Sequence, residues 1–197
     1  MLLKRCADVM LSLTALLLLA PVGAAIAVAI RLDSGGPVFF RQERVGLRFR
    51  RFQVWKFRTM LAADGPLITV AGDSRITRVG EFLRARKLDE LPQLWNVLRG
   101  DMSLVGPRPE VPEYVELFRE RYAVVLTVRP GITDLASIRF RNEEDLLSNS
   151  SEPLREYAER ILPAKLRLAE EYIGTRTMLG DISILFHTAS AILGSNG

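Results

Sequence analysis

The sequence predicts a mixed, helix-rich and irregular α/β fold. Three observations lead to this prediction: a long apolar run near the N-terminus, two short segments rich in aromatic and β-branched residues, and several later segments with helical apolar spacing. We expect two parts: a membrane helix kinked at a proline in residues 1–33, and one small domain of short strands and amphipathic surface helices in residues 34–197.

The composition fits one folded unit and limits its chemistry. The chain has 197 residues, of which 48% are hydrophobic and 25% charged. Its net charge of +4 favours anionic partners. A single cysteine, Cys6, excludes an internal disulfide and any multi-cysteine metal site. The single histidine, His187, is interpreted as structural, so carboxylates are the stronger catalytic candidates.

The apolar run covers residues 9–30 without a charged side chain, which is long enough for a helix to cross a bilayer. Three interpretations remain open: a cleaved signal peptide, a spanning helix, and a re-entrant helix that breaks at Pro21 and returns to the same side. Lys4 and Arg5 precede the run and six arginines follow it within residues 31–51, so both ends resemble cytoplasmic flanks. The re-entrant interpretation is favoured, with membrane phospholipids as its surroundings.

The first half of the remaining chain predicts a strand pair followed by two helices. Residues 37–45 and 52–60 are rich in aromatic and β-branched side chains and flank a turn-like segment, which is typical of paired strands. Residues 75–87 and 89–99 have helical spacing, and Gly100 ends the second of these helices.

The second half is predicted to be mostly helical. We expect a helix over residues 110–122, a turn at Pro130 and Gly131, and a strand over residues 136–140. From Glu152 onward the pattern is helical again, interrupted at Pro163.

The last helix carries an apolar stripe that could face either the core or the membrane, and the core is slightly favoured. The stripe consists of Ile182, Leu185, Phe186, Ala189, Ile192 and Leu193.

The densest cluster of unusual residues lies between Lys87 and Glu110 and reads KLDELPQLWNVLRGDMSLVGPRPE. Asp89 stands where the cap of the helix over residues 89–99 is expected, and capping alone would explain it. A helix N-terminus also binds phosphate, so Asp89 is a candidate nucleophile that attacks phosphorus and forms an acyl phosphate. Two anions repel, which calls for a divalent cation, Mg²⁺ or alternatively Mn²⁺, with Asp89 and Glu90 as its carboxylate ligands.

Four basic residues are candidates for binding the phosphates. Arg84 precedes the carboxylates on the preceding helix, and Arg108 lies in the stiff turn Pro-Arg-Pro. Lys56 and Arg58 alternate with aromatic residues on the second predicted strand. The structural alternatives are a solvated helix face for Arg84, an ion pair with Glu110 or Asp101 for Arg108, and contacts with lipid headgroups for the strand residues.

Residues 76–110, with the sequence ITRVGEFLRARKLDELPQLWNVLRGDMSLVGPRPE, resemble the bacterial sugar transferases called monotopic phosphoglycosyl transferases. The resemblance extends to the apolar N-terminus with its proline, to GPVFFRQERVG at 36–46, to KFRTM at 56–60 and to RPGIT at 129–133. Two departures are Ala20 before the proline, where some relatives have Ser, and Asp134 after RPGIT, where many have Gly.

The resemblance implies a monotopic enzyme of the bacterial inner membrane with its active site on the cytoplasmic face. It implies a Mg²⁺-dependent ping-pong reaction in which Asp89 takes a sugar phosphate from a UDP-sugar, releasing UMP, and polyprenyl phosphate then accepts it. Glu90 is implied as the catalytic partner, Arg84 and Arg108 as phosphate ligands, and Lys56 as a basic residue near the site. A homodimer is possible, and we expect no nucleic-acid partner.

The alternative from another class is a membrane-tethered basic binding or scaffold protein without catalysis. It explains the charge and the anchor but not the adjacent carboxylates and the Pro-Arg-Pro turn. A glycosyl transferase that passes the sugar alone commonly carries Asp-x-Asp, which this sequence lacks. The P-loop and G-x-G-x-x-G motifs are also absent from it.

Overall fold

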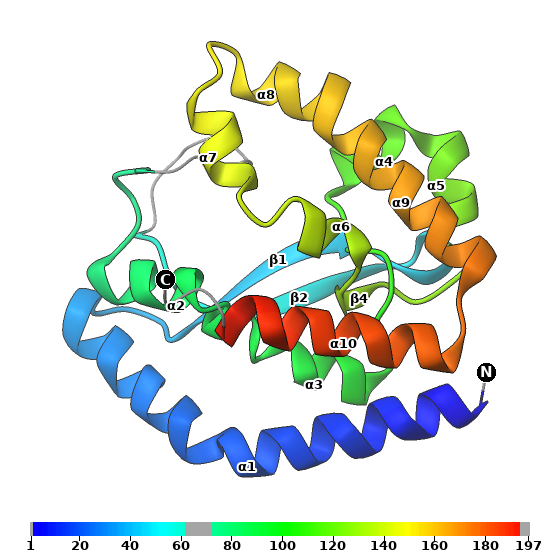
Figure 1. Cartoon of the computed structure of the whole chain (residues 1–197). Coiled ribbons are helices and arrows are strands. Elements are labelled where there is room, and N and C mark those ends of the chain that lie inside the picture. The colour runs from blue at the N-terminus through cyan, green and yellow to red at the C-terminus, as the bar shows by residue number, and fades with distance from the viewer. Residues whose placement is uncertain (1, 62–71, 194–197) are drawn as a thin grey trace.

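The computed structural model describes residues 2–61 and 72–193 and shows a helix-rich arrangement around short strands (Figure 1). A long N-terminal helix, α1, runs along one side of the molecule, and a β-hairpin lies between it and the later helices (Figure 1). The mixed, helix-rich fold with short strands and a long apolar N-terminal helix is therefore confirmed.

Helix α1 spans Leu2–Ser34 and is long and apolar enough to cross a membrane, with a mean hydropathy of 2.5 over its most apolar window. Only 11% of that window is buried, so most of its side chains face outward. The helix continues through Pro21, and its axis curves along its length (Figure 1). The break at Pro21 and the re-entrant path stay predictions.

The N-terminal end of α1 is attached to the rest of the chain by polar contacts. Arg5 donates a hydrogen bond to the carbonyl oxygen of Leu98 at 3.1 Å. The buried carboxylate of Asp8 accepts from Ser103 Oγ at 2.7 Å and from the backbone N–H of Leu104 at 3.2 Å. Because a buried carboxylate needs such partners, these hydrogen bonds fix the position of this end of α1 against the domain.

The C-terminal end of α1 contacts the same domain. Asp33 accepts a hydrogen bond from the backbone N–H of Val79 at 3.1 Å. Ile26 and Ile30 of α1 form one buried cluster with Phe57 and Leu83. Both ends of the apolar helix are thus attached to one body.

The predicted strand pair is confirmed as the antiparallel strands β1, Phe39–Val45, and β2, Arg51–Phe57. The connection contains a short 3₁₀ turn, Leu47–Phe49. Strand β2 ends at Phe57, earlier than the sequence predicted.

Helix α2 spans Arg78–Ala85 and helix α3 spans Gln93–Arg99, with a 3₁₀ turn, Leu88–Glu90, between them. The prediction that Asp89 caps a helix over residues 89–99 is wrong. Pro92 has no N–H with which to continue the helix, so α3 begins only after it. Asp89 consequently lies inside the 3₁₀ turn.

Two three-residue strands missed in the sequence, β3, Ser103–Val105, and β4, Gly131–Thr133, pair in parallel. They approach so closely that a Cβ at Gly131 would lie 2.1 Å from the backbone nitrogen of Gly106. This contact fixes the start of the Pro-Arg-Pro turn.

The strand predicted over residues 136–140 is wrong, because Leu135–Arg139 form helix α6. Asp134 caps this helix by accepting from the N–H of Ser137 at 2.6 Å. The helix predicted over residues 110–122 is present as two pieces, α4, Pro112–Leu117, and α5, Arg119–Val125.

The later chain forms α7, Glu143–Ser148, α8, Pro153–Glu156, and α9, Leu162–Thr175. A π-helical turn, Tyr157–Ile161, joins α8 to α9. The interruption expected at Pro163 therefore takes the form of a local π turn just before the proline, which occupies the first turn of α9.

Helix α10, Met178–Leu193, presents most of the described part of its apolar stripe outward, but Leu185 is half-buried and packs against the cluster of Val105, Tyr172 and Ile184. Ile182 and Phe186 are 46% and 72% exposed, whereas Asp181 and Ile184 are buried. The favoured core-facing interpretation is therefore wrong for Ile182 and Phe186, whereas Leu185 packs on the core. His187 is exposed and interacts only within its own helix, with Ser183, among the described contacts.

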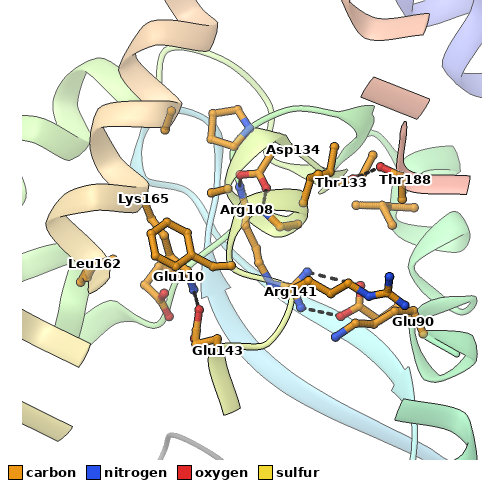
Figure 2. A pocket seen from close by; sticks show the side chains of 18 of the residues that line it. Glu90, Arg108, Glu110, Thr133, Asp134, Arg141, Glu143, Leu162, Lys165 and Thr188 are labelled. Atoms are coloured by element: carbon orange, nitrogen blue, oxygen red, sulfur yellow. Dashed lines mark hydrogen bonds and ion pairs between the residues drawn. The ribbon is translucent and has the colours of Figure 1, made fainter. Parts of the chain in front are cut away.

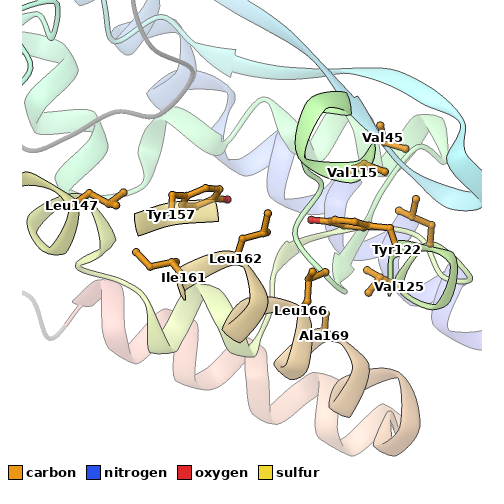
Figure 3. Packing of buried hydrophobic residues seen from close by; sticks show 11 residues of the cluster. Val45, Val115, Tyr122, Val125, Leu147, Tyr157, Ile161, Leu162, Leu166 and Ala169 are labelled. Atoms are coloured by element: carbon orange, nitrogen blue, oxygen red, sulfur yellow. The ribbon is translucent and has the colours of Figure 1, made fainter. Parts of the chain in front are cut away.

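The largest hydrophobic cluster joins α9 and the π turn to α4, α5, α7 and the end of β1 (Figure 3). Its members include Val45, Val115, Tyr122, Val125, Leu147, Tyr157, Ile161, Leu162, Leu166 and Ala169. It stabilises the side of the domain opposite α1 (Figure 1).

Candidate active site

The centre of the candidate site is the carboxylate of Glu90, which two cations share. Arg108 donates to both carboxylate oxygens of Glu90, one contact measuring 3.3 Å and the other shorter. Lys56 Nζ donates to Oε1 of Glu90 at 3.3 Å. Glu90 is the least exposed of the three, with 11% of its side chain accessible.

Asp89 lies directly beside this group, but its carboxylate differs from that of Glu90 in its hydrogen bonding. Only 5% of the residue is exposed, and its Oδ1 atom has no hydrogen-bond partner among the described residues. Burial raises the pKa of Asp89, while the positive charge of Lys56 opposes the increase. A buried carboxylate oxygen without a partner is unfavourable unless a ligand completes it, which is typical of a functional position.

The charges around Glu90 set its ionisation and that of its neighbours. Burial alone would raise the pKa of Glu90, but the charges of Arg108 and Lys56 outweigh it and hold that pKa well below its usual range. Glu90 in turn raises the pKa of Arg108, which stays a cation. Burial lowers the pKa of Lys56 despite the nearby Glu90 carboxylate. Glu90 is therefore an anion that holds two cations beside Asp89.

The Pro-Arg-Pro turn is held in place by Asp134. The backbone N–H of Arg108 donates to Oδ2 of Asp134 at 3.0 Å, while Oδ1 of the same carboxylate caps α6. Neither alternative partner considered for Arg108 is used, since Glu110 pairs with Arg44 and Asp101 with Arg99. The turn thus presents the Arg108 side chain to Glu90, as Figure 2 shows.

The other two predicted phosphate ligands have different partners. Arg84 forms an ion pair with Glu144 of α7, although its charge still acts to lower the pKa of Asp89. Arg58 donates to Ser34 Oγ at 2.6 Å and to the carbonyl oxygen of Gly35, at the end of α1. The structure thus brings Asp89, Glu90, Lys56 and Arg108 together and directs Arg58 toward the end of α1.

A cavity of about 280 Å³ opens beside the Arg108–Glu90 pair. Its walls come from α6, α9, α10 and the Pro-Arg-Pro turn, and its lining includes both members of the pair. Arg141, which the sequence analysis missed, also lines it and lies beside Arg108 and Glu90 (Figure 2). No motif marks Arg141 in the sequence, so only the fold reveals this additional cation.

The carboxylates of Asp89 and Glu90 fit a divalent cation that is bound by the protein and by substrate phosphates together. Within residues 2–61 and 72–193 no three His, Cys, Asp or Glu side chains cluster in a way that could hold a metal. The unpartnered Oδ1 of Asp89 and the neighbouring Glu90 provide two carboxylates. Mg²⁺ is commonly held by one or two carboxylates together with substrate phosphates, so this pair fits that mode of binding.

A comparison with protein families identifies the arrangement. The profile of the family described as bacterial sugar transferase matches residues 1–195. The chain belongs to the bacterial sugar transferase family. The match includes α1 as well as the domain that carries the carboxylates.

Curated bacterial proteins resemble the chain over nearly its full length. A UDP-glucose:undecaprenyl-phosphate glucose-1-phosphate transferase of Caulobacter vibrioides is 42% identical over 96% of this chain and 69% of its own length. The Escherichia coli protein of the same description is 40% identical over 95% of this chain but 39% of its own length. The exopolysaccharide production protein PSS of Rhizobium leguminosarum is 39% identical over 94% of this chain and 92% of its own length.

Proposed function

We propose that this protein transfers a sugar 1-phosphate from a UDP-sugar to polyprenyl phosphate through a covalent intermediate on Asp89. The activities of the Caulobacter and Escherichia relatives support the general reaction. The observation that carries the assignment to residues is the buried Asp89 carboxylate with an unpartnered oxygen, next to a Glu90 that is held by Arg108 and Lys56.

In the first half-reaction a carboxylate oxygen of Asp89 attacks the phosphorus that carries the sugar. An acyl phosphate bond forms, and the bond from that phosphorus to the bridging oxygen breaks, so that UMP leaves with the electron pair. Burial favours this attack because a poorly solvated carboxylate has little hydration to lose. Arg108 and Arg141, which line the adjoining cavity, neutralise the phosphate oxygens.

In the second half-reaction an oxygen of polyprenyl phosphate attacks the same phosphorus. The new bond completes a diphosphate, the acyl phosphate bond breaks, and Asp89 regains its carboxylate. Glu90 keeps Arg108 and Lys56 in position through both steps, since it accepts hydrogen bonds from each. The product is a polyprenyl diphosphate sugar, which would begin the membrane stage of polysaccharide synthesis.

A divalent cation, Mg²⁺ or Mn²⁺, would be held by Asp89 and Glu90 together with the substrate phosphates. When bound, it supplies positive charge that lowers the repulsion between the carboxylate and the diphosphate. The neighbouring cations of this chain contribute the same kind of charge from fixed positions.

We propose that α1 enters and leaves the bacterial inner membrane on its cytoplasmic face. Arg5 and Asp8 at one end and Asp33 at the other bond to the same domain. A straight spanning helix would separate these ends by the thickness of the bilayer, about 30 Å of hydrocarbon. Contacts from both ends to one domain therefore favour the re-entrant path, with the exposed middle of α1 among phospholipids.

The test is to trap the intermediate. Purified full-length protein in detergent or vesicles is mixed with UDP-glucose and Mg²⁺, without acceptor, and quenched rapidly. Intact-protein mass spectrometry should show a gain of one hexose phosphate, together with one equivalent of UMP. Asp89→Asn should show neither, whereas Asp101→Asn, at a carboxylate that pairs with Arg99, should behave as wild type.

The outcome also separates the enzyme from a scaffold protein. UMP release that depends on Asp89 and on Mg²⁺ excludes a purely binding role. Absence of any adduct and of any UMP release with UDP-glucose, UDP-galactose and their N-acetyl forms would overturn the proposal. The mass of the adduct also identifies the class of sugar.

A further inference from the structure

A second cavity, of about 420 Å³, lies between α1, the β-hairpin and α3. Its walls are one face of α1 between Leu16 and Ala27, the aromatic rings of Phe39, Trp55 and Phe57, and the side chains of Leu91, Pro92, Leu94 and Trp95. Every side chain that lines it is apolar, and its volume is typical of a ligand site. We call this cavity the apolar groove.

We propose that the apolar groove binds the first isoprene units of the polyprenyl phosphate acceptor. This inference rests on the proposed function and adds the place where the lipid chain lies. It makes the long N-terminal helix one wall of the acceptor site as well as a membrane anchor.

The groove is continuous with the candidate active site. Leu91 and Leu94 line both the apolar groove and the cavity that contains Arg108 and Glu90. Asp89 precedes Leu91 by two residues in the chain. An acceptor with an anionic head and an apolar chain therefore finds cations on one side of these leucines and an apolar surface on the other.

The chemistry of the lining selects the occupant. A peptide placed in the groove would lose water from its backbone N–H and C=O groups, and the apolar side chains offer them no partners. A branched hydrocarbon chain has no such requirement and gains from contact with the aromatic rings. Since one wall belongs to the membrane helix, such a chain can enter from the lipid without crossing water.

The small side chains of α1 leave the space into which the chain would fit. Ala20, Gly23, Ala24 and Ala27 line the groove from one face of the helix. Ala25 is adjacent in sequence and is also exposed, but it does not line the groove. The pair Ala24 and Ala25 therefore provides a substitution and its matched control, with identical chemistry on two faces of one helix.

The first experiment compares Ala24→Phe with Ala25→Phe in vesicles that contain polyprenyl phosphate. A phenylalanine at position 24 occupies the groove, so the KM for long-chain polyprenyl phosphate should rise at least about tenfold. Formation of the aspartyl adduct without acceptor should stay within about twofold of wild type, because the donor does not use the groove. Ala25→Phe should match wild type in both measurements.

The second experiment locates the chain directly. A polyprenyl phosphate with a diazirine in its first isoprene units is photolysed with the full-length wild-type protein, and the labelled peptides are sequenced. The label should appear on the α1 segment between Leu16 and Ala27 and on the segment that contains Trp95. Unlabelled polyprenyl phosphate should compete for the labelling, whereas phosphatidylglycerol at the same concentration should not.

Each result bears on the inference. If Ala24→Phe and Ala25→Phe have the same KM, or if the label falls elsewhere, the inference is overturned. Equal competition by phosphatidylglycerol would make the groove a general phospholipid site and would also overturn it. In all these cases UMP release by wild type would still support the proposed function, whose failure would appear instead as no adduct and no UMP.

Discussion

Asn96 offers a direct test of how the active-site segment is held on the sheet. Its fully buried side chain bridges α3 and β2: Oδ1 accepts from the backbone N–H of Trp55 at 3.1 Å, and Nδ2 donates to the carbonyl oxygen of Gln53 at 2.7 Å. The 3₁₀ turn with Asp89 precedes α3 in the chain. We predict that Asn96→Ala destabilises the protein and loosens this turn.

The magnitude follows from the two hydrogen bonds. Each contributes about 1 kcal/mol net, and the two backbone groups left buried without partners add further cost, so we expect a loss of about 3 kcal/mol. With a urea dependence of about 2 kcal/mol/M, the unfolding midpoint should fall by between about 1 and 2 M. UMP release should decline in parallel, because the turn that carries Asp89 loses its support.

Intrinsic fluorescence reports on this contact. The sequence has 2 tryptophans, and both lie next to Asn96. The backbone N–H of Trp55 donates to the Asn96 side chain, and Trp95 precedes Asn96 in the chain. Urea unfolding in detergent can therefore be followed at the contact itself. Asn149→Ala, at an exposed side chain that donates to the carbonyl oxygen of Asp145, is the control and should shift stability by less than about 0.5 kcal/mol. A loss below about 1 kcal/mol for Asn96→Ala would refute the reasoning.

Three further predictions concern the site and its support. Glu90→Gln should slow UMP release at least about tenfold in steady-state assays, because a neutral amide cannot balance the charges of Lys56 and Arg108, which the Glu90 carboxylate holds. Asp89→Asn should stabilise the fold at pH 7 by about 1 kcal/mol in urea unfolding, because it removes a buried charge. The pKa of Asp89 is raised in the folded protein, so its protonation stabilises the fold fully below the ordinary value of 3.8, and this stabilisation is lost as pH rises. The difference in unfolding free energy between Asp89→Asn and wild type should therefore shrink in acid. Gly131→Ala should cost at least about 2 kcal/mol, because its Cβ would lie 2.1 Å from Gly106, whereas Gly174→Ala, with open space around it, should not destabilise.

Each of these predictions has a contrary outcome. Unchanged kinetics for Glu90→Gln would limit that residue to a structural role. A destabilised Asp89→Asn would mean that the buried carboxylate has a partner that stabilises its charge. Equal stability of the two glycine variants would refute the close approach of β3 and β4.

The sequence predicted the parts of the site that follow from local chemistry. Adjacent carboxylates followed by Pro-Arg-Pro indicated a phosphate site, and the structure places Asp89, Glu90 and Arg108 together. The sequence predicts the same role for Lys56 and Arg58 because residues two apart share one face of a strand. Strand β2 ends at Phe57, so the alternation stops between them and Arg58 interacts with the end of α1.

The remaining features depend on contacts between distant segments. Strands β3 and β4 have three residues each and pair because Gly106 and Gly131 allow their backbones to approach closely. No local sequence pattern predicts this contact. Arg84 pairs with Glu144, 60 positions later, a partner that composition cannot select. The prediction of a strand over residues 136–140 is wrong because Asp134 caps a helix there. The same carboxylate accepts from the backbone N–H of Arg108, a contact between distant segments that fixes its position.

Helix α1 is connected through β3 to the turn that carries Arg108, which changes what removal of α1 would do. Asp8 of α1 holds Ser103 and Leu104 at the start of β3. That strand leads directly into the turn that presents Arg108 to Glu90. Because Asp8 is buried and bonded on this path, loss of α1 would remove the carboxylate that positions Ser103 and Leu104 and would expose them to water. We therefore predict that a chain without α1 loses the position of Arg108 together with the apolar helix, and that added detergent or lipid does not restore UMP release.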